Sequence, residues 1–263
     1  MLISIITINK NNYEGLSLTL NSVRGLIEKI PCFFELIIID GASTDNSIPF
    51  VMKNIDIVKH FESGVDSGIY NAMNKGVKAA SGEFIIFMNS GDLFASEFDV
   101  VEFNKIISGY ASNKYPIFAL NNIVKIGCFY KRRKLRSGLD YPSHQATIYP
   151  SLVFVENLYD ENFKIAGDYH FFKKVIKKFE VSYVDMFVSV NEIGGISNNW
   201  KSLDQIKLHV NEIALIDNMN YINKYKLFIN IFVKFILIKI IGMDLFYILI
   251  EYFHDRNSRR INF

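Results

Sequence analysis

Four aspartates in the first hundred residues follow apolar stretches, and their oxygens suit a bound cation. Asp40 ends the run "FELIIID", Asp45 lies in the turn after it, Asp66 precedes a helical pattern, and Asp92 closes the turn after "EFIIFM". Carboxylates that lie together repel one another unless a cation or hydrogen-bond donors hold them. Magnesium and manganese prefer oxygen ligands and often bridge to phosphates, so the pattern indicates a metal-assisted diphosphate site. Turn formation is the competing explanation for Asp92, because Asn, Ser, Gly and Asp favour turns.

The apolar runs before these aspartates predict buried strands. The runs are nearly continuous in Ile, Leu and Phe, which is typical of strands covered on both faces. Apolar residues at helical spacing lie between them, with Ser67 as the expected cap and Gly82 as the expected end of the second helix. The predicted strands are residues 2–8, 34–40, 51–58 and 84–88, and the predicted helices are residues 16–27 and 69–77.

This alternation of strands and helices predicts an α/β fold with a mostly parallel central sheet flanked by helices. In open α/β sheets, ligands bind where the carboxyl ends of parallel strands meet. We therefore expect Asn9, Asp40 and the turn 89–92 to share one edge. The chain contains neither a Gly-rich Walker loop nor the Rossmann dinucleotide fingerprint, so a nucleotide would be held in another way.

The composition excludes several classes of protein. Of the 263 residues, 50% are hydrophobic and 21% are charged, with a net charge of +2, so we expect neither a disordered chain nor a nucleic-acid partner. The two cysteines, Cys32 and Cys128, predict a reducing compartment rather than a disulfide framework. The first residues, "MLISIITINK", lack the basic lead-in of a signal peptide, so we expect a cytoplasmic protein.

Several sequence blocks resemble one enzyme family. They are "SIITINKNNYEGLSLTLNSV", "ELIIIDGASTDNS", "ESGVDSGIYNAMNKGVKAASGEFIIFMNSGD" and, later, "AGDYHFFKK". Over roughly residues 1–200 the chain resembles the family 2 inverting glycosyltransferases, and "SGIYNAMNKG" with "FMNSGD" resembles a subgroup that builds O-antigen, capsule and colanic-acid repeat units. The resemblance implies the GT-A fold, with a nucleotide-sugar-binding half (1–98) and an acceptor-side half (99–200). The remaining residues, 201–263, are expected to form a C-terminal helical extension that associates with a membrane.

The resemblance also implies which side chains hold the donor. Asp40 corresponds to the acid that contacts the base, and Asp92 to the acid of the D-x-D motif that binds Mn²⁺ or Mg²⁺. Asn89 and Gly91 stand where that motif frequently has aspartates, so metal binding without donor should be weak. We expect a metal-dependent enzyme, with metal-free activity as the alternative. The implied nucleotide-sugar contacts are Thr7, Asn9, Asp40, Gly41, Ser43, Asp45, Glu62, Asp66, Asn74, Lys75, Asn89, Ser90 and Gly91.

On the acceptor side, the resemblance implies that Asp168 is the general base that activates the acceptor hydroxyl. A Gly-Asp pair before an apolar-faced helix is also typical of a helix N-cap, and the two roles are compatible. Glu192, in "VNEIGG", is the second candidate for the base. His144 and Gln145, in "PSHQAT", are expected near the acceptor or its diphosphate, although a single histidine is more often structural.

The C-terminal stretch 221–253 is rich in Ile, Leu and Phe, but lysines interrupt it before it reaches the ~18 apolar residues of a spanning helix. Lys226, Asn230 and Lys234 form a polar stripe that fits a helix lying in the membrane interface. The alternative is a helical pair packed on the catalytic domain or on a second copy of the chain. The basic run 254–260 fits an anionic leaflet, and the basic run 131–136 is either a solvated loop or a diphosphate contact.

Together these patterns predict an inverting hexosyltransferase that lies peripherally on the inner face of the cytoplasmic membrane. It would move a hexose from a nucleotide sugar, for which we expect a UDP-sugar, to a saccharide on a polyprenyl diphosphate. Two alternatives stay open. One is a sugar nucleotidyltransferase, for which "TINKNNYEG" is a poor phosphate loop, and the other is a non-catalytic nucleotide-binding protein.

Overall fold

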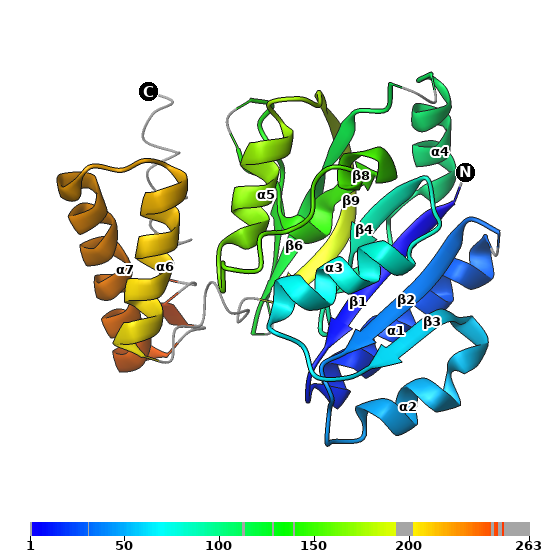
Figure 1. The fold of residues 1–263 in the computed structure, drawn as a ribbon, viewed down its shortest axis with the longest axis horizontal. Coiled ribbons are helices and arrows are strands. Elements are labelled where there is room, and N and C mark those ends of the chain that lie inside the picture. The colour runs from blue at the N-terminus through cyan, green and yellow to red at the C-terminus, as the bar shows by residue number, and fades with distance from the viewer. Residues whose placement is uncertain are drawn as a thin grey trace. The chain divides into compact units, whose positions relative to one another are not determined.

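The computed structural model describes residues 2–30, 32–111, 114–127, 129–138, 140–192 and 202–242, and residues 245, 246 and 249 (Figure 1). The chain divides into two compact units, residues 1–124 with 131–192, and residues 125–130 with 193–263. The domain boundary predicted at residue 200 falls among residues 193–201, outside the described part, so the domain limits stay a prediction. Cys128 and the basic run 254–260 also lie outside the described residues.

The first four strands form the parallel half of the sheet. They are β1 (Ile3–Asn9), β2 (Phe34–Asp40), β3 (Val58–Ser63) and β4 (Phe84–Phe87). Their order is β3-β2-β1-β4, with β1 in parallel register with β2 on one side and β4 on the other. All of β2 and β4 is buried, which agrees with the covered strands that their continuous apolar sequences predict.

Helices cover both faces of this half. They are α1 (Tyr13–Lys29), α2 (Ser47–Lys53), the short 3-10 helix η1 (Ile55–Ile57) and α3 (Ile69–Ala79). In Figure 1, α3 crosses the front of the sheet and α1 lies behind it. This follows from right-handed crossovers, because the chain moves outward from β1 to β3 and then returns to β4 on the other side of β1. Helix α1 buries Leu16, Leu20 and Val23 in the core, as their spacing predicts.

Three local predictions in this half are wrong, and the first two concern β3 and the start of α3. The strand expected at 51–58 starts only at Val58, because the preceding residues belong to α2 and η1. The N-cap of α3 is Gly68, which makes no side-chain cap bond, and not Ser67. The hydroxyl of Ser67 instead donates to Glu161 over 3.1 Å, so a long-range partner has replaced the local one.

Gly82 does not end α3 as predicted. The helix ends at Ala79, and Gly82 is buried at the start of β4, where an added Cβ would lie 2.6 Å from Ser4 Oγ and 2.8 Å from the carbonyl oxygen of Leu2. The glycine therefore allows the β4 segment to approach β1 closely.

The second half of the chain extends the sheet with antiparallel strands. β8 pairs with β4, and β6 pairs with β8. The described strands form one nine-stranded sheet in the order β3-β2-β1-β4-β8-β6-β9-β5, with β7 beside β6. The elements are β5 (Leu93–Phe94), α4 (Val100–Ser108), β6 (Ile117–Ile126), β7 (Phe129–Arg133), η2 (His144–Ala146), β8 (Thr147–Pro150), η3 (Ser151–Phe154), α5 (Gly167–Val175) and β9 (Val181–Glu192).

The C-terminal unit contains a helical hairpin of α6 (Leu203–Ile216) and α7 (Tyr221–Ile241). Ile206 and Val210 of α6 form its buried core, and the partly buried side chains packed on them are Leu227, Phe228, Ile231 and Phe235 of α7. Within the residues that the structure describes, no helix has both the length and the apolarity needed to cross a membrane.

Candidate active site

Asn9 and Asp40 lie opposite each other at the carboxyl ends of β1 and β2. Asn9 Nδ2 donates to Asp40 Oδ1 over 2.8 Å and to Ser43 Oγ over 3.2 Å, and all three side chains are buried. Burial opposes ionisation of Asp40, but hydrogen bonds from Ser43, Asn9 and Ser63 outweigh it and lower the pKa of Asp40. The sheet edge therefore carries a fixed, ionised carboxylate at the end of β2, where the sequence predicts it.

Two buried polar atoms at this edge have no hydrogen-bond partner among the described residues. They are Thr7 Oγ1, on β1, and Asn9 Oδ1, at its end. Buried polar atoms are rarely left unsatisfied in folded proteins. Both residues were expected to line the donor pocket, and their unused atoms are suited to a ligand that enters at this edge.

The turn after β2 is held close to the loop that follows β3. Gly41 N donates to the carbonyl oxygen of Asn9 over 2.8 Å, and a Cβ on Gly41 would lie 2.6 Å from Asp66 Oδ2. Asp45 accepts from the backbone N–H groups of Tyr13 (2.9 Å) and Ser47 (3.0 Å). Asp45 thus links the loop after β1 to the start of α2, and the structure brings Gly41 and Asp66 together.

The remaining predicted donor contacts on β3 and α3 have partners inside the protein. Glu62 pairs with Lys75 over 2.9 Å. Asn74 is buried, and its amide donates to the carbonyl oxygen of Tyr159 (3.0 Å) and to Glu161 (2.9 Å). Asn74 therefore faces the second half of the chain, and its contact with a donor stays a prediction.

The turn 89–92 is fixed by a threonine that the sequence interpretation missed. Thr19 Oγ1, from α1, accepts from Gly91 N (2.9 Å) and lies 2.8 Å from the carbonyl oxygen of Asp92 and 3.2 Å from that of Asn89. Gly91 has φ +105°, a backbone conformation that favours glycine. Ser90 is tied to β1, because its N and Oγ both donate to the carbonyl oxygen of Ile8.

Asp92 is half-buried at the tip of this turn. Burial raises the pKa of its carboxyl to about 6, and hydrogen bonds from Asn191 and Gln145 offset part of that rise. Asn191 Nδ2 lies 3.1 Å from Asp92 Oδ1. Asn89 Oδ1 is buried and has no partner among the described residues. A carboxylate and an unused amide oxygen on one turn are oxygen donors of the kind that Mg²⁺ and Mn²⁺ accept.

The four aspartates do not form one acidic cluster in the described part of the chain. The described residues contain no group of three or more His, Cys, Asp or Glu side chains that could hold a metal ion. Asp40 and Asp45 are used by the separate hydrogen bonds given above, and Asp66 accepts from Gly68 N over 3.1 Å. Asp92 is the metal ligand that the resemblance implies, and that role stays a prediction.

Asp168 lies in the first turn of α5, but it is not the N-cap. The cap is Ala166, which makes no side-chain cap bond, and the helix begins at Gly167. Tyr70 Oη lies 3.3 Å from Asp168 Oδ1. In this position the carboxylate is held on a regular element of the fold, as the positioning of a general base requires.

The helix η2 lies between the two acids. Gln145 hydrogen-bonds to Asp92, and His144 is close enough to Asp168 for that charge to act on its ring. His144 is buried, stacks on Phe87 (4.6 Å between ring centroids) and lies 2.8 Å from Tyr159 Oη through Nε2. Burial lowers the pKa of His144, and Asp168 raises it less. These contacts favour the structural role of His144, while Gln145 lies at the site.

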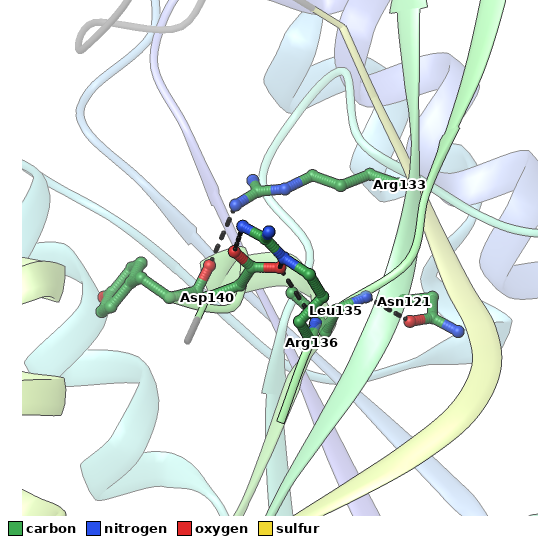
Figure 2. Close-up of polar contacts among 6 residues, drawn as sticks. Asn121, Arg133, Leu135, Arg136 and Asp140 are labelled. Atoms are coloured by element: carbon green, nitrogen blue, oxygen red, sulfur yellow. Dashed lines mark hydrogen bonds and ion pairs between the residues drawn. The ribbon is translucent and has the colours of Figure 1, made fainter. Parts of the chain in front are cut away.

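The second candidate for the general base, Glu192, is exposed at the end of β9, next to Asn191. Figure 2 shows the basic loop, in which Nε and Nη2 of Arg136 donate to the carboxylate of Asp140 (3.1 and 2.8 Å). Arg133 donates to the carbonyl oxygen of Tyr141 over 3.1 Å. This pairing lowers the pKa of Asp140 to about 2.

The loop cations therefore have protein partners. Lys134 binds Asp185 (2.9 Å), and Arg132 binds Glu97 (2.8 Å). These contacts favour a folded structural loop over the diphosphate contact that was its alternative.

The geometry can be set beside known proteins. Residues 4–122 match the profile of the family described as Glycosyl transferase family 2. This stretch of the chain is similar to the family 2 glycosyltransferases. An uncharacterized glycosyltransferase of Mycobacterium tuberculosis (strain ATCC 25618 / H37Rv) is 31% identical over 180 residues, which cover 64% of this chain and 66% of that protein. These matches support the family expected from the sequence blocks, whereas the O-antigen and capsule subgroup stays a prediction.

Solved structures support the fold of this protein. S. aureus TarS 1–349 has a TM-score of 0.59 at 20% identity, covering 87% of this chain and 69% of that chain. Its complex with UDP-GlcNAc has a TM-score of 0.57 at 18% identity, covering 87% and 70%. The mannosyltransferase PcManGT from Pyrobaculum calidifontis, in complex with GDP-Man and Mn²⁺, has a TM-score of 0.59 at 11% identity, covering 83% and 64%. This likeness confirms the α/β GT-A architecture.

Several residues of the site escaped sequence interpretation. Asn191 follows the strand "VSYVDMFVSV", where a polar side chain at the end of a run is an ordinary turn signal. Thr19 stands among the apolar positions of the helix 16–27, and that break in the pattern is the one signal it offers. Tyr70 lies 98 positions from Asp168 in the chain, so only its contact in the fold connects the two. Glu161 is likewise joined to Asn71 only through the fold, over 90 positions.

Proposed function

We propose that the protein is an inverting glycosyltransferase that moves a hexose from a UDP-sugar to a saccharide on a polyprenyl diphosphate, in O-antigen, capsule or exopolysaccharide biosynthesis. The observation that carries this proposal is the turn 89–92, which presents Asp92 at the same sheet edge as Asn9 and Asp40. The similarity to the family 2 glycosyltransferases supports the reaction class. The UDP-GlcNAc bound by TarS supports a nucleotide-sugar donor.

The donor would enter at the carboxyl edge of β1 and β2. Thr7 Oγ1 and Asn9 Oδ1, both buried and without a partner among the described residues, would take its base or ribose. Gly41, Ser43 and Asp66 border that edge. Gly41 has no side chain, so a ligand can approach the backbone closely there.

A divalent ion fits the turn 89–92. Asp92 and the unused Asn89 Oδ1 would supply two oxygens, and the donor diphosphate and water would supply the others. When bound, Mn²⁺ or Mg²⁺ neutralises charge on the departing diphosphate. Because Asp92 is the single carboxylate of the turn 89–92, the ion should bind tightly only with the nucleotide.

Asp168 would act as the general base. Its carboxylate takes the proton of the acceptor hydroxyl while that oxygen forms a bond to the anomeric carbon of the donor sugar. The bond from that carbon to the diphosphate oxygen breaks, and UDP leaves with the electron pair. One displacement from the opposite side inverts the anomeric configuration. The position of Asp168 in the first turn of α5 holds the base on a rigid element.

The C-terminal hairpin would place the enzyme on an anionic membrane. Helix α7 exposes apolar side chains at helical spacing, namely Ile222, Tyr225, Ile229, Val233, Ile236 and Ile240. An exposed apolar stripe of this size usually marks an interaction surface. Between α6 and α7 lies a cavity of about 250 Å³ whose lining includes Lys207 and Lys224, which suit a phosphate headgroup.

Donor binding tests the proposal first. We expect calorimetry to show binding of UDP in preference to GDP and CMP, tightened by MnCl₂, and weakened at least tenfold by Asp92→Ala. Release of UDP from UDP-glucose, UDP-galactose, UDP-GlcNAc and UDP-GalNAc then measures turnover. Asp168→Asn should abolish turnover and keep UDP affinity. UDP binding with no turnover in any variant would favour the non-catalytic alternative, and formation of a UDP-sugar from UTP and a sugar phosphate would favour a nucleotidyltransferase.

Vesicle sedimentation tests the membrane part. We expect the protein to sediment with vesicles containing phosphatidylglycerol and not with pure phosphatidylcholine. Replacing Ile229 and Val233 by Glu should release it, whereas Val101→Glu, at an exposed apolar position on α4, should not. A concentration-dependent dimer that the same double variant dissociates, without vesicle binding, would instead assign the stripe to a second copy of the chain.

A further inference from the structure

The polar side chains of α3 and of the turn before it gather on one acid of the second half of the chain. Ser67 Oγ, Asn71 Nδ2 and Asn74 Nδ2 all donate to the carboxylate of Glu161, over 3.1, 2.9 and 2.9 Å. Hydrogen bonds from Asn74, then Asn71 and Ser67, lower the pKa of Glu161. These hydrogen bonds therefore fix the segment "SGIYNAMNKG" to the residues that precede α5.

Tyr70, in the same segment, reaches the start of α5 itself. Its hydroxyl accepts from Gly167 N over 2.7 Å, and it lies 2.8 Å from the carbonyl oxygen of Ile165 and 3.3 Å from Asp168 Oδ1. A phenol has one proton and two lone pairs, so it can serve as donor and acceptor at once. One hydroxyl thus contacts the backbone on both sides of the helix start and the side chain of Asp168.

The hydroxyl of Tyr70 replaces the N-cap side chain that the residue before α5 does not provide. The N-cap of α5, Ala166, offers no side-chain oxygen to the unpaired N–H groups of the first turn. The Tyr70 hydroxyl takes that place for Gly167 N. Gly167 in turn makes room, because an added Cβ would lie 2.6 Å from the ring of Tyr70. Tyr70 is 1% exposed and stacks on Tyr159, so its hydroxyl is held in place.

We propose that Tyr70 is the positioning residue of Asp168, and that α3, clamped through Glu161, carries this contact from the donor half to the acceptor half of the domain. The proposal rests on the proposed function, in which Asp168 is the base. Small displacements of a base relative to the reacting atoms cost large factors in rate. Tyr70 therefore acts on turnover through Asp168 and has no contact of its own with donor or acceptor.

Tyr70→Phe tests the proposal, with Tyr159→Phe as the matched control. Both substitutions remove one buried hydroxyl from stacked rings, but the hydroxyl of Tyr159 contacts His144 and not α5. The probe is hydrolysis of whichever UDP-sugar of the panel above is turned over fastest. We expect Tyr70→Phe to lower kcat roughly tenfold to a hundredfold, with the calorimetric Kd for UDP changed less than twofold. Tyr159→Phe should lower kcat less than threefold.

Glu161→Gln is a second test, for the case that Tyr70→Phe does not fold. We expect this variant to fold, because Glu161 is half-buried and the amide oxygen of glutamine still accepts hydrogen bonds. We expect a kcat loss of about threefold to tenfold, again with UDP affinity retained. Equal kcat losses for Tyr70→Phe and Tyr159→Phe, or a loss of UDP affinity that parallels kcat, would overturn the proposal. If Asp168→Asn keeps full turnover, the assignment of the base fails, which is a separate result.

Discussion

Asn191 donates a hydrogen bond of 3.1 Å to Asp92, and this bond joins the end of β9 to the turn after β4, 99 residues away in the chain. The orientation of the amide is fixed, because Asn191 Oδ1 accepts from Asn122 (3.0 Å) and Ser189 (3.1 Å). The carboxylate of Asp92 is therefore held by Nδ2 of Asn191, and Oδ1 of the same amide is itself hydrogen-bonded. Such support residues commonly decide how well a ligand group is positioned.

Replacing Asn191 by Ala should weaken the binding of UDP in the presence of Mn²⁺. The carboxylate of Asp92 loses a donor that fixes its direction, which we expect to cost about 1–2 kcal/mol, or fivefold to thirtyfold in Kd. Calorimetry with UDP and MnCl₂ measures the change. Asn121→Ala is the control, because Asn121 is a buried asparagine of β6 that contacts Leu135 and Asp185. Equal Kd values for the wild type and Asn191→Ala would contradict the prediction.

Metal-dependent binding of UDP should strengthen as the pH rises through about 6. Burial raises the pKa of Asp92 to about 6, so the carboxyl is largely protonated at pH 5 and must lose that proton to bind a cation. Calorimetry from pH 5 to 8, in buffers of different ionisation enthalpy, measures both the affinity and the proton released. Asn191→Ala should move the midpoint upward, because the bond from Asn191 lowers this pKa. A Kd that is flat over this range would contradict the assignment.

Thr19→Val should destabilise the protein and loosen the turn 89–92. Valine has nearly the shape of threonine, but it leaves Gly91 N without its acceptor. An unsatisfied buried group of this kind costs about 1–3 kcal/mol in the free energy of unfolding. Urea unfolding measures the loss, and Thr19→Ser, which keeps the hydroxyl, should recover most of it. A Thr19→Val protein as stable as the wild type would show that the hydroxyl does not hold the turn.

The parallel half of the fold could be predicted because its signals are local. Continuous Ile and Leu runs gave β1, β2 and β4, and the ends of those strands placed Asn9, Asp40 and the turn 89–92 at one edge. The edge strand β3 was harder, because its sequence is only half-buried and lacks a continuous apolar run.

The contacts that hold the site could not be predicted, because they are long-range. Ser67 looked like a helix cap, since a cap is the commonest local use of serine before a helix, but Glu161 is its partner in the fold. Asp168 looked like a cap for the same reason, although the helix starts before it. In both cases a tertiary hydrogen bond decided the role of a residue whose local pattern suggested another.

Gly41→Ala should lower the affinity for UDP with little change in stability. The new Cβ would lie 2.6 Å from Asp66 Oδ2, and this side chain must move away from the edge where the donor is proposed to bind. The end of a side chain can shift at small cost, so we expect less than about 1 kcal/mol in unfolding. Gly25→Ala is the control, because nothing lies within 4 Å of its Cβ position and alanine favours the helix α1. Unchanged UDP affinity would remove Asp66 from the donor site.

Glu35 is a buried acid at the other end of the sheet, away from the carboxyl edge. Its carboxylate accepts from Ser4 Oγ (2.5 Å), from Ser81 through N (2.6 Å) and Oγ (2.7 Å), and from Gly82 N (3.0 Å). Burial opposes ionisation, but the bonds from Ser4, Ser81 and Gly82 outweigh it and lower the pKa of Glu35. The acid therefore joins β2 to the entry of β4, and its charge contributes to folding.

Glu35→Gln should cost about 1–3 kcal/mol of unfolding free energy at pH 7 and progressively less in acid. The folded-state pKa is depressed, so the stabilisation is fully present above the unfolded value near 4.3 and is lost as the pH falls through the folded value. Urea unfolding between pH 7 and 3.5 measures both proteins, whose curves should converge at the acid end. Glu102→Gln, on the exposed pair with Lys105, should follow the wild type throughout. A gap between the Glu35→Gln and wild-type curves that stays constant with pH would mean that the glutamine disturbs packing and that the charge of Glu35 contributes nothing.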